Sequence, residues 1–307
     1  MDKFVGMKTV LVTGSNGLLG QKITENILVN KQFNLIATSK GPNRYPDKVG
    51  YVYEELDILD PGQVRNVVAQ YHPDAIIHTA AMTNVDTCEQ HQEEAHALNV
   101  EALSTLVALC ETLNIQLIHL STDFVFDGED GPYDETAKPS PLSYYGRTKT
   151  KAEGLLQQSH CKWAILRTIL VYGIVKDMSR SNIVLWAKNA LEKGEPLNIV
   201  NDQWRMPTLA EDLAEACLKA VEKEVTGIYH ISGKDMMCIS ELVGRVADHY
   251  QLDKTLIHEV SSATLNQAAG RPKRTGFRLD KAMRDLDYRP HSFEEGMAIL
   301  DRQMTKP

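Results

Sequence analysis

Three glycines directly after an apolar run constrain the fold of this chain most. Val10–Thr13 is followed at once by Gly14, Gly17 and Gly20. The apolar run predicts a β-strand, and the residues after it predict a helix. Glycines in such a connection let phosphates approach the backbone amides and the positive end of the helix. The spacing indicates a dinucleotide pyrophosphate site, and the alternative is an ordinary strand-to-helix turn.

Short apolar runs alternate with longer amphipathic segments as far as Tyr172. Pro61 marks the first turn of one crossover helix, and Glu93–Leu113 is the longest helical candidate. Right-handed crossovers between parallel strands favour an α/β, Rossmann-type, doubly wound sheet covered on both faces. The predicted strands are Thr9–Thr13, Asn34–Thr38, Tyr51–Glu54, Ala75–His78, Leu117–Ser121 and Trp163–Arg167.

The rhythm changes after Tyr172, which predicts a second and smaller mixed α/β domain at the C-terminal end. Its predicted elements include a helix near Ser181–Lys193, a helix over Ala210–Glu222 and a strand at Gly227–Ile231. We therefore expect a dinucleotide-binding domain of residues 1–172, to which part of 199–224 returns, and a substrate-binding domain of residues 173–198 and 225–307.

Composition excludes several classes of function. The formal net charge of -8 argues against a nucleic-acid-binding groove. The five cysteines are odd in number and form no CxxC pair, which favours reduced thiols in the cytoplasm. No apolar run approaches the ~20 residues of a membrane span, and no metal-binding pattern is present. We expect a cytoplasmic protein without nucleic-acid, membrane or metal partners. A homodimer is a possible oligomeric state.

Tyr145 and Lys149 are four residues apart in a predicted helix. They share one helix face, where the ammonium can lower the pKa of the phenol. Moving that pKa from ~10 to ~7 takes roughly 4 kcal/mol. Thr122, at the end of the preceding strand, adds a hydroxyl group. The three groups predict reduction of a carbonyl by a nicotinamide, with coincidence as the alternative because this spacing alone is common.

The residues after the second strand indicate the type of cofactor. Ser39, Lys40 and Arg44 supply hydroxyl and cationic groups where an acid commonly meets the ribose of NAD. These groups suit a 2′-phosphate, so NADPH is favoured while NADH stays possible; the alternative is a solvated loop. Asp57 follows the third strand, where it either meets the adenine amine or acts as a turn or cap residue before Pro61.

Six segments together resemble the extended short-chain dehydrogenase/reductases, specifically the dTDP-4-dehydrorhamnose reductase subfamily, over nearly the whole chain. They are Thr13-Gly-Ser-Asn-Gly-Leu-Leu-Gly20, Ala80-Ala-Met-Thr-Asn-Val-Asp86, Ser121-Thr-Asp-Phe-Val-Phe-Asp-Gly128, Pro141-Leu-Ser-Tyr-Tyr-Gly-Arg-Thr-Lys149, Arg167-Thr168 with Val171-Tyr172, and Asn201-Asp-Gln203 with Pro207-Thr208. The resemblance implies that Thr122, Tyr145 and Lys149 are catalytic and that Lys149 also holds the nicotinamide ribose.

The residue pattern and the resemblance together give a set of cofactor residues. Asn99 belongs to it through the resemblance, and helix packing is an equal alternative for its role. The set is Gly14, Asn16, Gly17, Leu18, Leu19, Ser39, Lys40, Arg44, Asp57, Ile58, Ala80, Ala81, Met82, Asn99, Tyr145 and Lys149.

Three positions depart from the subfamily on the substrate side. Phe124 stands where a tyrosine is usual, Leu170 where a tryptophan is usual, and Arg205 where a glycine is common. The lost phenol and indole remove a hydrogen bond and a stacking surface, which neighbouring groups would have to replace. The predicted substrate residues are Asp123, Phe124, Gln203, Trp204 and Arg205. Arg271 and Arg274 either clamp a pyrophosphate or lie in a solvated turn.

These expectations lead to two hypotheses for function. The first is an NADP(H)-dependent reductase of a nucleotide-linked 4-keto-6-deoxy sugar, similar to dTDP-4-dehydrorhamnose reductase. The second follows from a resemblance of the same pattern to the regulatory β subunit of methionine adenosyltransferase, which implies a non-catalytic NADP(H)-binding protein.

Overall fold

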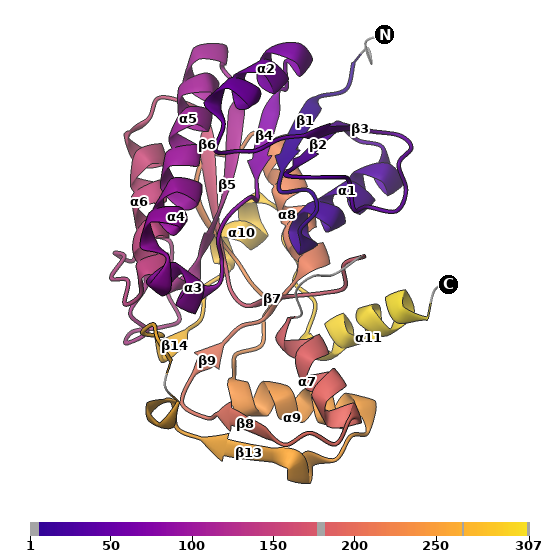
Figure 1. Ribbon diagram of the computed structural model, residues 1–307, viewed down its shortest axis with the longest axis vertical. Coiled ribbons are helices and arrows are strands. Elements are labelled where there is room, and N and C mark those ends of the chain that lie inside the picture. Colours follow the sequence, from indigo (N-terminus) through magenta and orange to yellow (C-terminus); the bar gives the residue numbers. More distant parts are fainter. Residues whose placement is uncertain (1–5, 177–181, 266, 306–307) are drawn as a thin grey trace.

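Seven parallel strands form the central sheet of the computed structural model, which describes residues 6–176, 182–265 and 267–305 (Figure 1). All six strands predicted from apolar runs are present, which confirms the Rossmann-type α/β fold. The strand order reverses between β1 and β4, which creates the crevice where doubly wound sheets bind ligands. In sheet order the strands are β11 (Gly227–Ile231), β6 (Trp163–Thr168), β5 (Gln116–Thr122), β4 (Ala75–His78), β1 (Thr9–Thr13), β2 (Asn34–Ser39) and β3 (Val52–Glu55).

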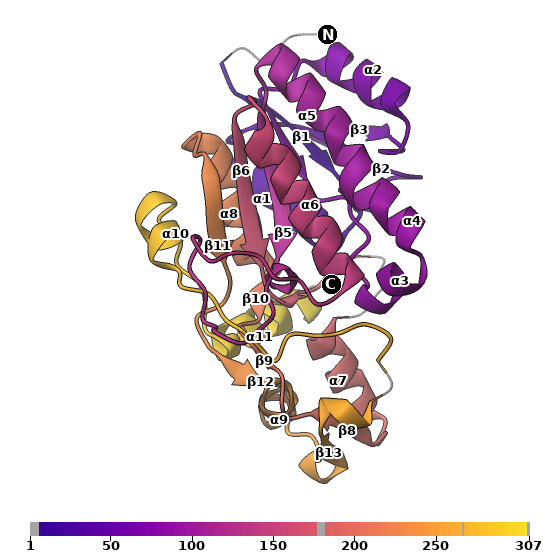
Figure 2. The ribbon, with the colours of Figure 1, turned by 90° about the vertical axis from the view of Figure 1, so that its left-hand side faces the viewer.

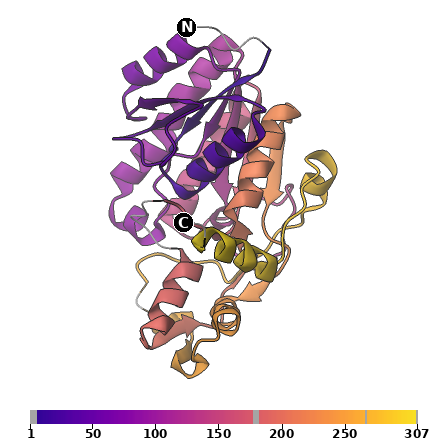
Figure 3. The ribbon, with the colours of Figure 1, turned by 90° about the vertical axis from the view of Figure 1, so that its right-hand side faces the viewer.

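Helices cover both faces of this sheet. On one face lie α2 (Pro61–Tyr71), α5 (Ala102–Leu113) and α6 (Tyr144–Gln158) (Figure 2); on the other lie α1 (Leu18–Asn30) and α8 (Ala210–Glu222) (Figure 3). Alternate residues of a strand serve the two faces: Val10 and Val12 belong to one core cluster and Leu11 to the other. The inner strands are therefore mostly apolar, as the sequence indicated, whereas the edge strand β3 carries Glu54 and Glu55.

The helix predicted over Glu93–Leu113 is interrupted. A short helix α4 (Gln92–His96) passes through one π-helical turn, η1 (Ala97–Glu101), before α5 begins. The buried Asn99 of that turn accepts a hydrogen bond from the Met82 backbone N at 2.8 Å and donates one to the Met82 carbonyl oxygen at 3.0 Å. The wider turn thus ties the helix to the loop after β4.

The second part of the chain has its own apolar core, formed by residues of α7, α9 and α11 and of strand β8. The helix predicted near Ser181–Lys193 is α7, whose described part starts at Ile183; Ser181 lies outside the described residues. The main elements of this second part are α7 (Ile183–Glu192), β8 (Leu197–Val200), α9 (Ile239–Tyr250), β13 (Ile257–Val260) and α11 (Phe293–Met304).

The remaining described elements are short. They are α3 (Val85–Gln90), the 3-10 turns η2 (Asp123–Val125), η3 (Lys254–Leu256) and η4 (Ser262–Thr264), β7 (Val171–Tyr172) paired with β10 (Thr208–Leu209), the three-stranded β12 (Met237–Cys238), β9 (Trp204–Arg205) and β14 (Arg274–Thr275), and α10 (Asp280–Asp285).

Strand β11 corrects one part of the predicted division. We expected residues 225–307 in the second domain, but Gly227–Ile231 pairs with Ala164–Thr168 of β6 at the edge of the central sheet. An exposed sheet edge has free hydrogen-bonding groups, and the first parallel strand that can reach it satisfies them. The other domain boundaries stay a prediction. No helix among the described residues is long and apolar enough to cross a membrane.

Candidate active site

A cleft of about 910 Å³ opens at the carboxyl ends of the central strands, with walls from both parts of the chain. This is the position at which doubly wound folds bind ligands. Most of the predicted site residues lie on its wall: Gly14, Asn16, Gly17, Leu18, Leu19, Ser39, Lys40, Arg44, Ala81, Thr122, Asp123, Phe124, Tyr145, Lys149, Gln203 and Arg205.

The glycine turn fits a pyrophosphate. Gly14 has a φ of 71°, and a Cβ there would lie 2.8 Å from the Ala80 backbone N, so no other residue fits. A Cβ on Gly20 would lie 2.5 Å from the Gly14 carbonyl oxygen. Gly17 precedes α1 and caps it with no side chain, which leaves the first amides of the helix for an anion.

The rim beyond β2 carries the groups predicted to meet a 2′-phosphate. Ser39, Lys40 and Arg44 all face the cleft, and the Arg44 backbone N donates to Asn16 Oδ1 at 2.8 Å. Lys40 Nζ lies 2.7 Å from Asp57 Oδ2, and this hydrogen bond holds the pKa of Asp57 below its usual range. Asp57 also accepts from the Leu59 backbone N, as the turn interpretation predicts.

Tyr145 and Lys149 reach the cleft because α6 begins very close to the end of β5. Ser143 caps the helix by accepting from the Gly146 backbone N at 3.2 Å. A Cβ on Gly146 would lie 2.2 Å from the Phe124 carbonyl oxygen, so only glycine permits this approach. Thr122 then hydrogen-bonds to the Tyr145 side chain, and Lys149 Nζ donates to the Leu120 carbonyl oxygen at 3.0 Å.

Burial dominates the acidity of this pair. It raises the pKa of Tyr145 above its usual value, while the Thr122 hydrogen bond opposes the rise. It also lowers the pKa of Lys149 to about 8. The expected low pKa of this phenol is therefore wrong for the structure described, because burial removes the water that would hydrate the phenolate. Tyr145 is a protonated phenol at neutral pH, the form that can donate a proton.

A buried ion pair supports α6 one turn beyond Lys149, and sequence reasoning missed it. Arg167 donates from Nε to Glu153 Oε1 at 2.9 Å and from Nη2 to Oε2 at 2.6 Å. Ser121, next to Thr122, donates to Glu153 Oε1 at 2.6 Å. The spacing from Lys149 to Glu153 was the available signal, since residues four apart share a helix face.

On the substrate side, the structure separates Trp204 from Arg205. The two residues are adjacent in β9 and point to opposite faces, so Arg205 lines the cleft and Trp204 does not. Trp204 is 37% exposed and packs under the Arg274 guanidinium. The prediction of Trp204 as a substrate residue is therefore wrong in this geometry.

Arg205 has little capacity left for a substrate. It donates to the carbonyl oxygens of Trp204 and Pro272 at 2.8 Å each, and its Nε lies 3.6 Å from Asp123 Oδ2. Asp123 in turn accepts from Thr275 Oγ1 at 2.5 Å. The Arg205 guanidinium also lies over the Phe124 ring, which meets Tyr145 edge-on. The arginine therefore stabilises this wall, and its guanidinium is already engaged by protein groups.

Several predicted cofactor residues lie off the cleft wall. Ile58 is buried in the core beside α2 and α5. Asn99 spends its carboxamide on Met82 and on Thr148 Oγ1, which favours the packing interpretation. The predicted cofactor residues outside the wall are Asp57, Ile58, Ala80, Met82 and Asn99.

Of the two arginines considered for a pyrophosphate, only Arg271 faces the cleft. It forms a two-pronged pair with Asp86 at 2.6 and 3.2 Å, which joins the second part of the chain to the start of α3. Arg274 is exposed and stacks on Trp204.

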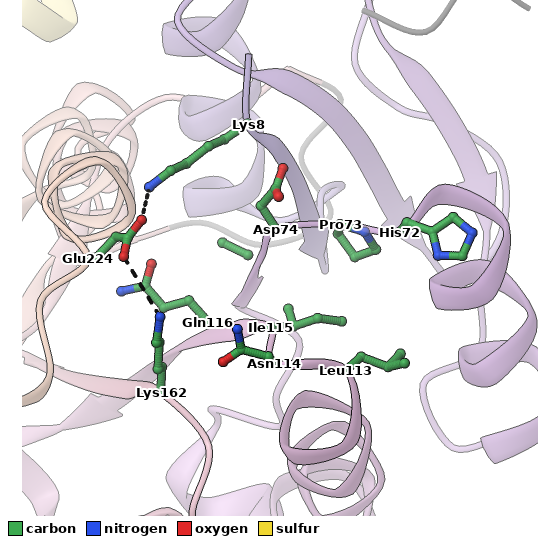
Figure 4. Close-up of a pocket in the computed structure, with 11 residues that line it drawn as sticks. Lys8, His72, Pro73, Asp74, Leu113, Asn114, Ile115, Gln116, Lys162 and Glu224 are labelled. Atoms are coloured by element: carbon green, nitrogen blue, oxygen red, sulfur yellow. Dashed lines mark hydrogen bonds and ion pairs between the residues drawn. The ribbon is translucent and has the colours of Figure 1, made fainter. Parts of the chain in front are cut away.

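Another pocket, of about 410 Å³, lies at the opposite ends of the central strands (Figure 4). Glu224 sits between two lysines there, 2.6 Å from Lys8 Nζ and 3.9 Å from Lys162 Nζ. These are the amino ends of the strands, where doubly wound folds do not bind their ligands. Both of its lysines are paired with Glu224, so we place the candidate active site in the larger cleft.

Comparison with known proteins identifies relatives of this arrangement. Residues 7–305 match the family model described as RmlD substrate binding domain. The chain is 30% identical over 292 residues to a probable low-salt glycan biosynthesis reductase of Haloferax volcanii, covering 94% of this chain and 96% of that protein. It is 32% identical over 278 residues to methionine adenosyltransferase 2 subunit beta of Danio rerio, covering 89% and 83%.

Solved structures agree with the sequence relatives. The crystal structure of dTDP-4-dehydrorhamnose reductase from Bacillus anthracis str. Ames in complex with NADP superposes with a TM-score of 0.84 and 26% identity, covering 97% of this chain and all of that one. Since the family model matches nearly the whole chain, this protein belongs to the RmlD substrate-binding-domain family, a branch of the extended short-chain dehydrogenase/reductases.

Proposed function

We propose that this protein is an NADPH-dependent reductase of a nucleotide-linked 4-keto-6-deoxy sugar, of the dTDP-4-dehydrorhamnose type. One observation carries the proposal: Thr122, Tyr145 and Lys149 meet on the wall of the same cleft as the glycine turn. A hydroxyl, a protonated phenol and an ammonium beside a dinucleotide turn suit reduction of a carbonyl. The similarity to a dTDP-4-dehydrorhamnose reductase supports the substrate class.

The residues present fit a nicotinamide dinucleotide. Gly14 and Gly17 leave room for the pyrophosphate at the start of α1, and Ser39, Lys40 and Arg44 suit a 2′-phosphate. The relative from Bacillus anthracis str. Ames binds NADP, which supports the same cofactor here. When bound, such a cofactor supplies the hydride.

The side chains of the chain itself handle the proton. Tyr145, kept protonated by burial, donates its phenolic proton to the substrate carbonyl oxygen. Lys149 places a cation behind that phenol, fixed by the Leu120 carbonyl. Thr122 hydrogen-bonds to Tyr145 and orients its hydroxyl. Phe124 packs edge-on to Tyr145 and makes the adjoining wall of the cleft apolar.

The decisive experiment measures NADPH oxidation with dTDP-4-dehydrorhamnose and with a panel of other nucleotide 4-keto sugars. Tyr145→Phe should lower kcat by about 100-fold or more while NADPH affinity stays nearly unchanged, because only the proton donor is lost. Tyr144→Phe is the matched control, since this neighbouring tyrosine stacks on Arg147 instead. NADPH binding without product from any ketone, in the wild-type chain, would contradict the proposal.

A second candidate function is that of a cofactor-binding subunit of a larger assembly. The 32% identity to methionine adenosyltransferase 2 subunit beta of Danio rerio favours it. In this case the chain should bind NADPH without consuming it and should form a stable complex with a methionine adenosyltransferase catalytic chain in size-exclusion chromatography. Turnover of a keto sugar at enzymatic rates and no such complex would exclude this candidate.

A further inference from the structure

Lys149 is a buried cation, and the acidic residue that acts on it, Glu153, belongs to the same helix α6. Its side chain is almost completely buried, and the Leu120 carbonyl oxygen is the acceptor for its Nζ. A carbonyl oxygen provides a hydrogen bond but no compensating charge. Burial lowers the pKa of Lys149 to about 8 even though Glu153 acts against this lowering, so the lysine is close to the point at which it loses its proton at neutral pH. The charge of Lys149 therefore depends on what surrounds it.

Three titratable groups on other elements lie near Lys149 among the described residues, and two more lie on α6 itself. They are His78 of β4, His119 of β5 and Cys88 of α3, and Tyr145 and Glu153 of α6. Burial lowers the pKa of both histidines far below neutrality, raises the pKa of the Cys88 thiol to about 11 and raises the pKa of the Tyr145 phenol. These four groups are neutral at pH 7, which leaves Glu153 as the negative charge acting on Lys149.

The Glu153 carboxylate is fixed in position on the helix that carries Lys149. It lies one helical turn beyond Lys149, and its side chain is 1% exposed. Ser121 and Arg167 fix both carboxylate oxygens, with distances of 2.6 to 2.9 Å. Arg167 comes from β6, the strand that pairs with β5, and it in turn contacts His230 Nε2 at 3.3 Å. The Glu153–Arg167 pair is thus oriented with its negative end on the helix that carries Lys149.

We propose that Glu153 is a positioning residue that keeps Lys149 charged inside the dry site, and that Arg167 and Ser121 hold Glu153 in this role. The proposal rests on the proposed function in one respect only, namely that Lys149 acts in reduction. Ser121 is the neighbour of Thr122, so the same network also fixes the end of β5 against α6.

The test uses the full chain and removes both buried charges together. Glu153→Gln with Arg167→Met keeps the volume and avoids leaving an unpaired buried arginine. Arg167→Met alone keeps the negative charge near Lys149, and Glu93→Gln changes an exposed acid on α4 as a control. The first readout is unfolding by urea at pH 7, 8 and 9, which needs no substrate.

The sign of the expected effect follows from the lowered pKa of Lys149. The pKa of Lys149 is 10.5 in the unfolded chain and about 8 in the folded chain. Between these two values the unfolded chain binds more protons, so the free energy of unfolding decreases as pH falls from 10.5 to about 8 and does not decrease further below about pH 8. Without Glu153 the folded pKa should drop by about 1 unit, so the double variant should keep losing stability between pH 8 and 7. Adding Lys149→Met should abolish this loss.

The second readout is the alkaline limb of NADPH oxidation. It should move about 1 pH unit toward neutrality in the double variant and should not move down in Arg167→Met. A wild-type chain without turnover would refute the proposed function, while the unfolding experiment would still decide the role of Glu153. An unchanged pH dependence of unfolding in the double variant would overturn the inference. If that variant does not fold, titration of lysine-labelled wild-type protein by NMR decides it, because a neutral Lys149 at pH 7 would also overturn the inference.

Discussion

The guanidinium Nε of Arg205 lies 3.6 Å from the carboxylate of Asp123, and both buried side chains belong to the wall of the cleft. Burial raises the pKa of Asp123, and Arg205 is the main opposing influence. Asp123 also accepts a hydrogen bond from Thr122 at 3.0 Å, so the ion pair adjoins the candidate catalytic group.

Removing one member of this pair should be more harmful than removing both. Arg205→Met leaves the Asp123 carboxylate buried without a cation and should cost about 3 to 5 kcal/mol of unfolding free energy. Arg205→Met with Asp123→Asn should recover most of that loss. Urea unfolding at pH 7 measures both. Equal losses in the single and double variants would show that Arg205 acts through its bonds to the Trp204 and Pro272 carbonyls instead.

Two glycines of α6 should respond oppositely to alanine. Gly146→Ala places a Cβ 2.2 Å from the Phe124 carbonyl oxygen, so the helix start must move away from the cleft. We expect lower stability and loss of reductase activity. Gly154→Ala meets nothing within 4 Å and should stabilise the helix by about 0.5 to 1 kcal/mol. Thermal unfolding and NADPH oxidation compare the two, and a harmless Gly146→Ala would contradict the close approach.

Cofactor selectivity should depend on the rim after β2. NADPH should bind more tightly than NADH by at least ~1 kcal/mol, and Arg44→Ala should narrow the gap because it removes a cation facing the 2′-phosphate. Arg65→Ala, on the exposed side of α2, is the control. Calorimetric titration of the wild type and both variants with NADPH and NADH gives the six affinities. Equal binding of both cofactors to the wild-type chain would refute this assignment.

The opposite faces of β9 lead to a prediction about substrate binding. Trp204→Ala should leave the KM for the keto sugar unchanged, since Trp204 packs on Arg274 outside the cleft. Phe124→Ala should raise KM, because its ring forms the wall beside Tyr145. Steady-state kinetics separates the two. A large rise in KM for Trp204→Ala would mean that strand β9 rotates when substrate binds, so that Trp204 enters the cleft.

Acid should destabilise the protein through three buried histidines. Burial lowers the pKa of His78 and of His230 to about 3, and that of His119 well below its usual value. The unfolded chain binds protons below pH 6.5 while the folded chain does not, so stability is complete above that pH and falls as pH drops toward 3. The slope should reach about 4 kcal/mol per pH unit.

His119→Phe should reduce this slope by about one third, since neither ring nitrogen of His119 has a hydrogen-bond partner among the described residues. His258→Gln, on the exposed side of β13, is the control. Urea unfolding between pH 4 and 7 provides the comparison. The same slope in His119→Phe and the wild type would show that His119 is protonated in the folded chain.

Local features of the sequence were sufficient for the fold and for much of the site. Strand positions follow from short apolar runs, because a strand buried on both faces needs apolar side chains throughout. The glycine turn follows β1 directly, and Tyr145 and Lys149 share a helix face through their spacing alone. These inferences need only neighbouring residues, so the sequence determined them.

Contacts between distant segments decided the rest. The pKa of Tyr145 rises because the packed cleft removes water from the phenol, and no local pattern shows how deep a side chain will lie. β11 joins the central sheet because β6 offers it an edge. Arg205 is committed to the Trp204 and Pro272 carbonyls and to the Asp123 carboxylate of η2, so its role became visible only when these distant segments met. Sequence determined which groups are available, and tertiary structure decided their hydration and partners, because both depend on residues far apart in the chain.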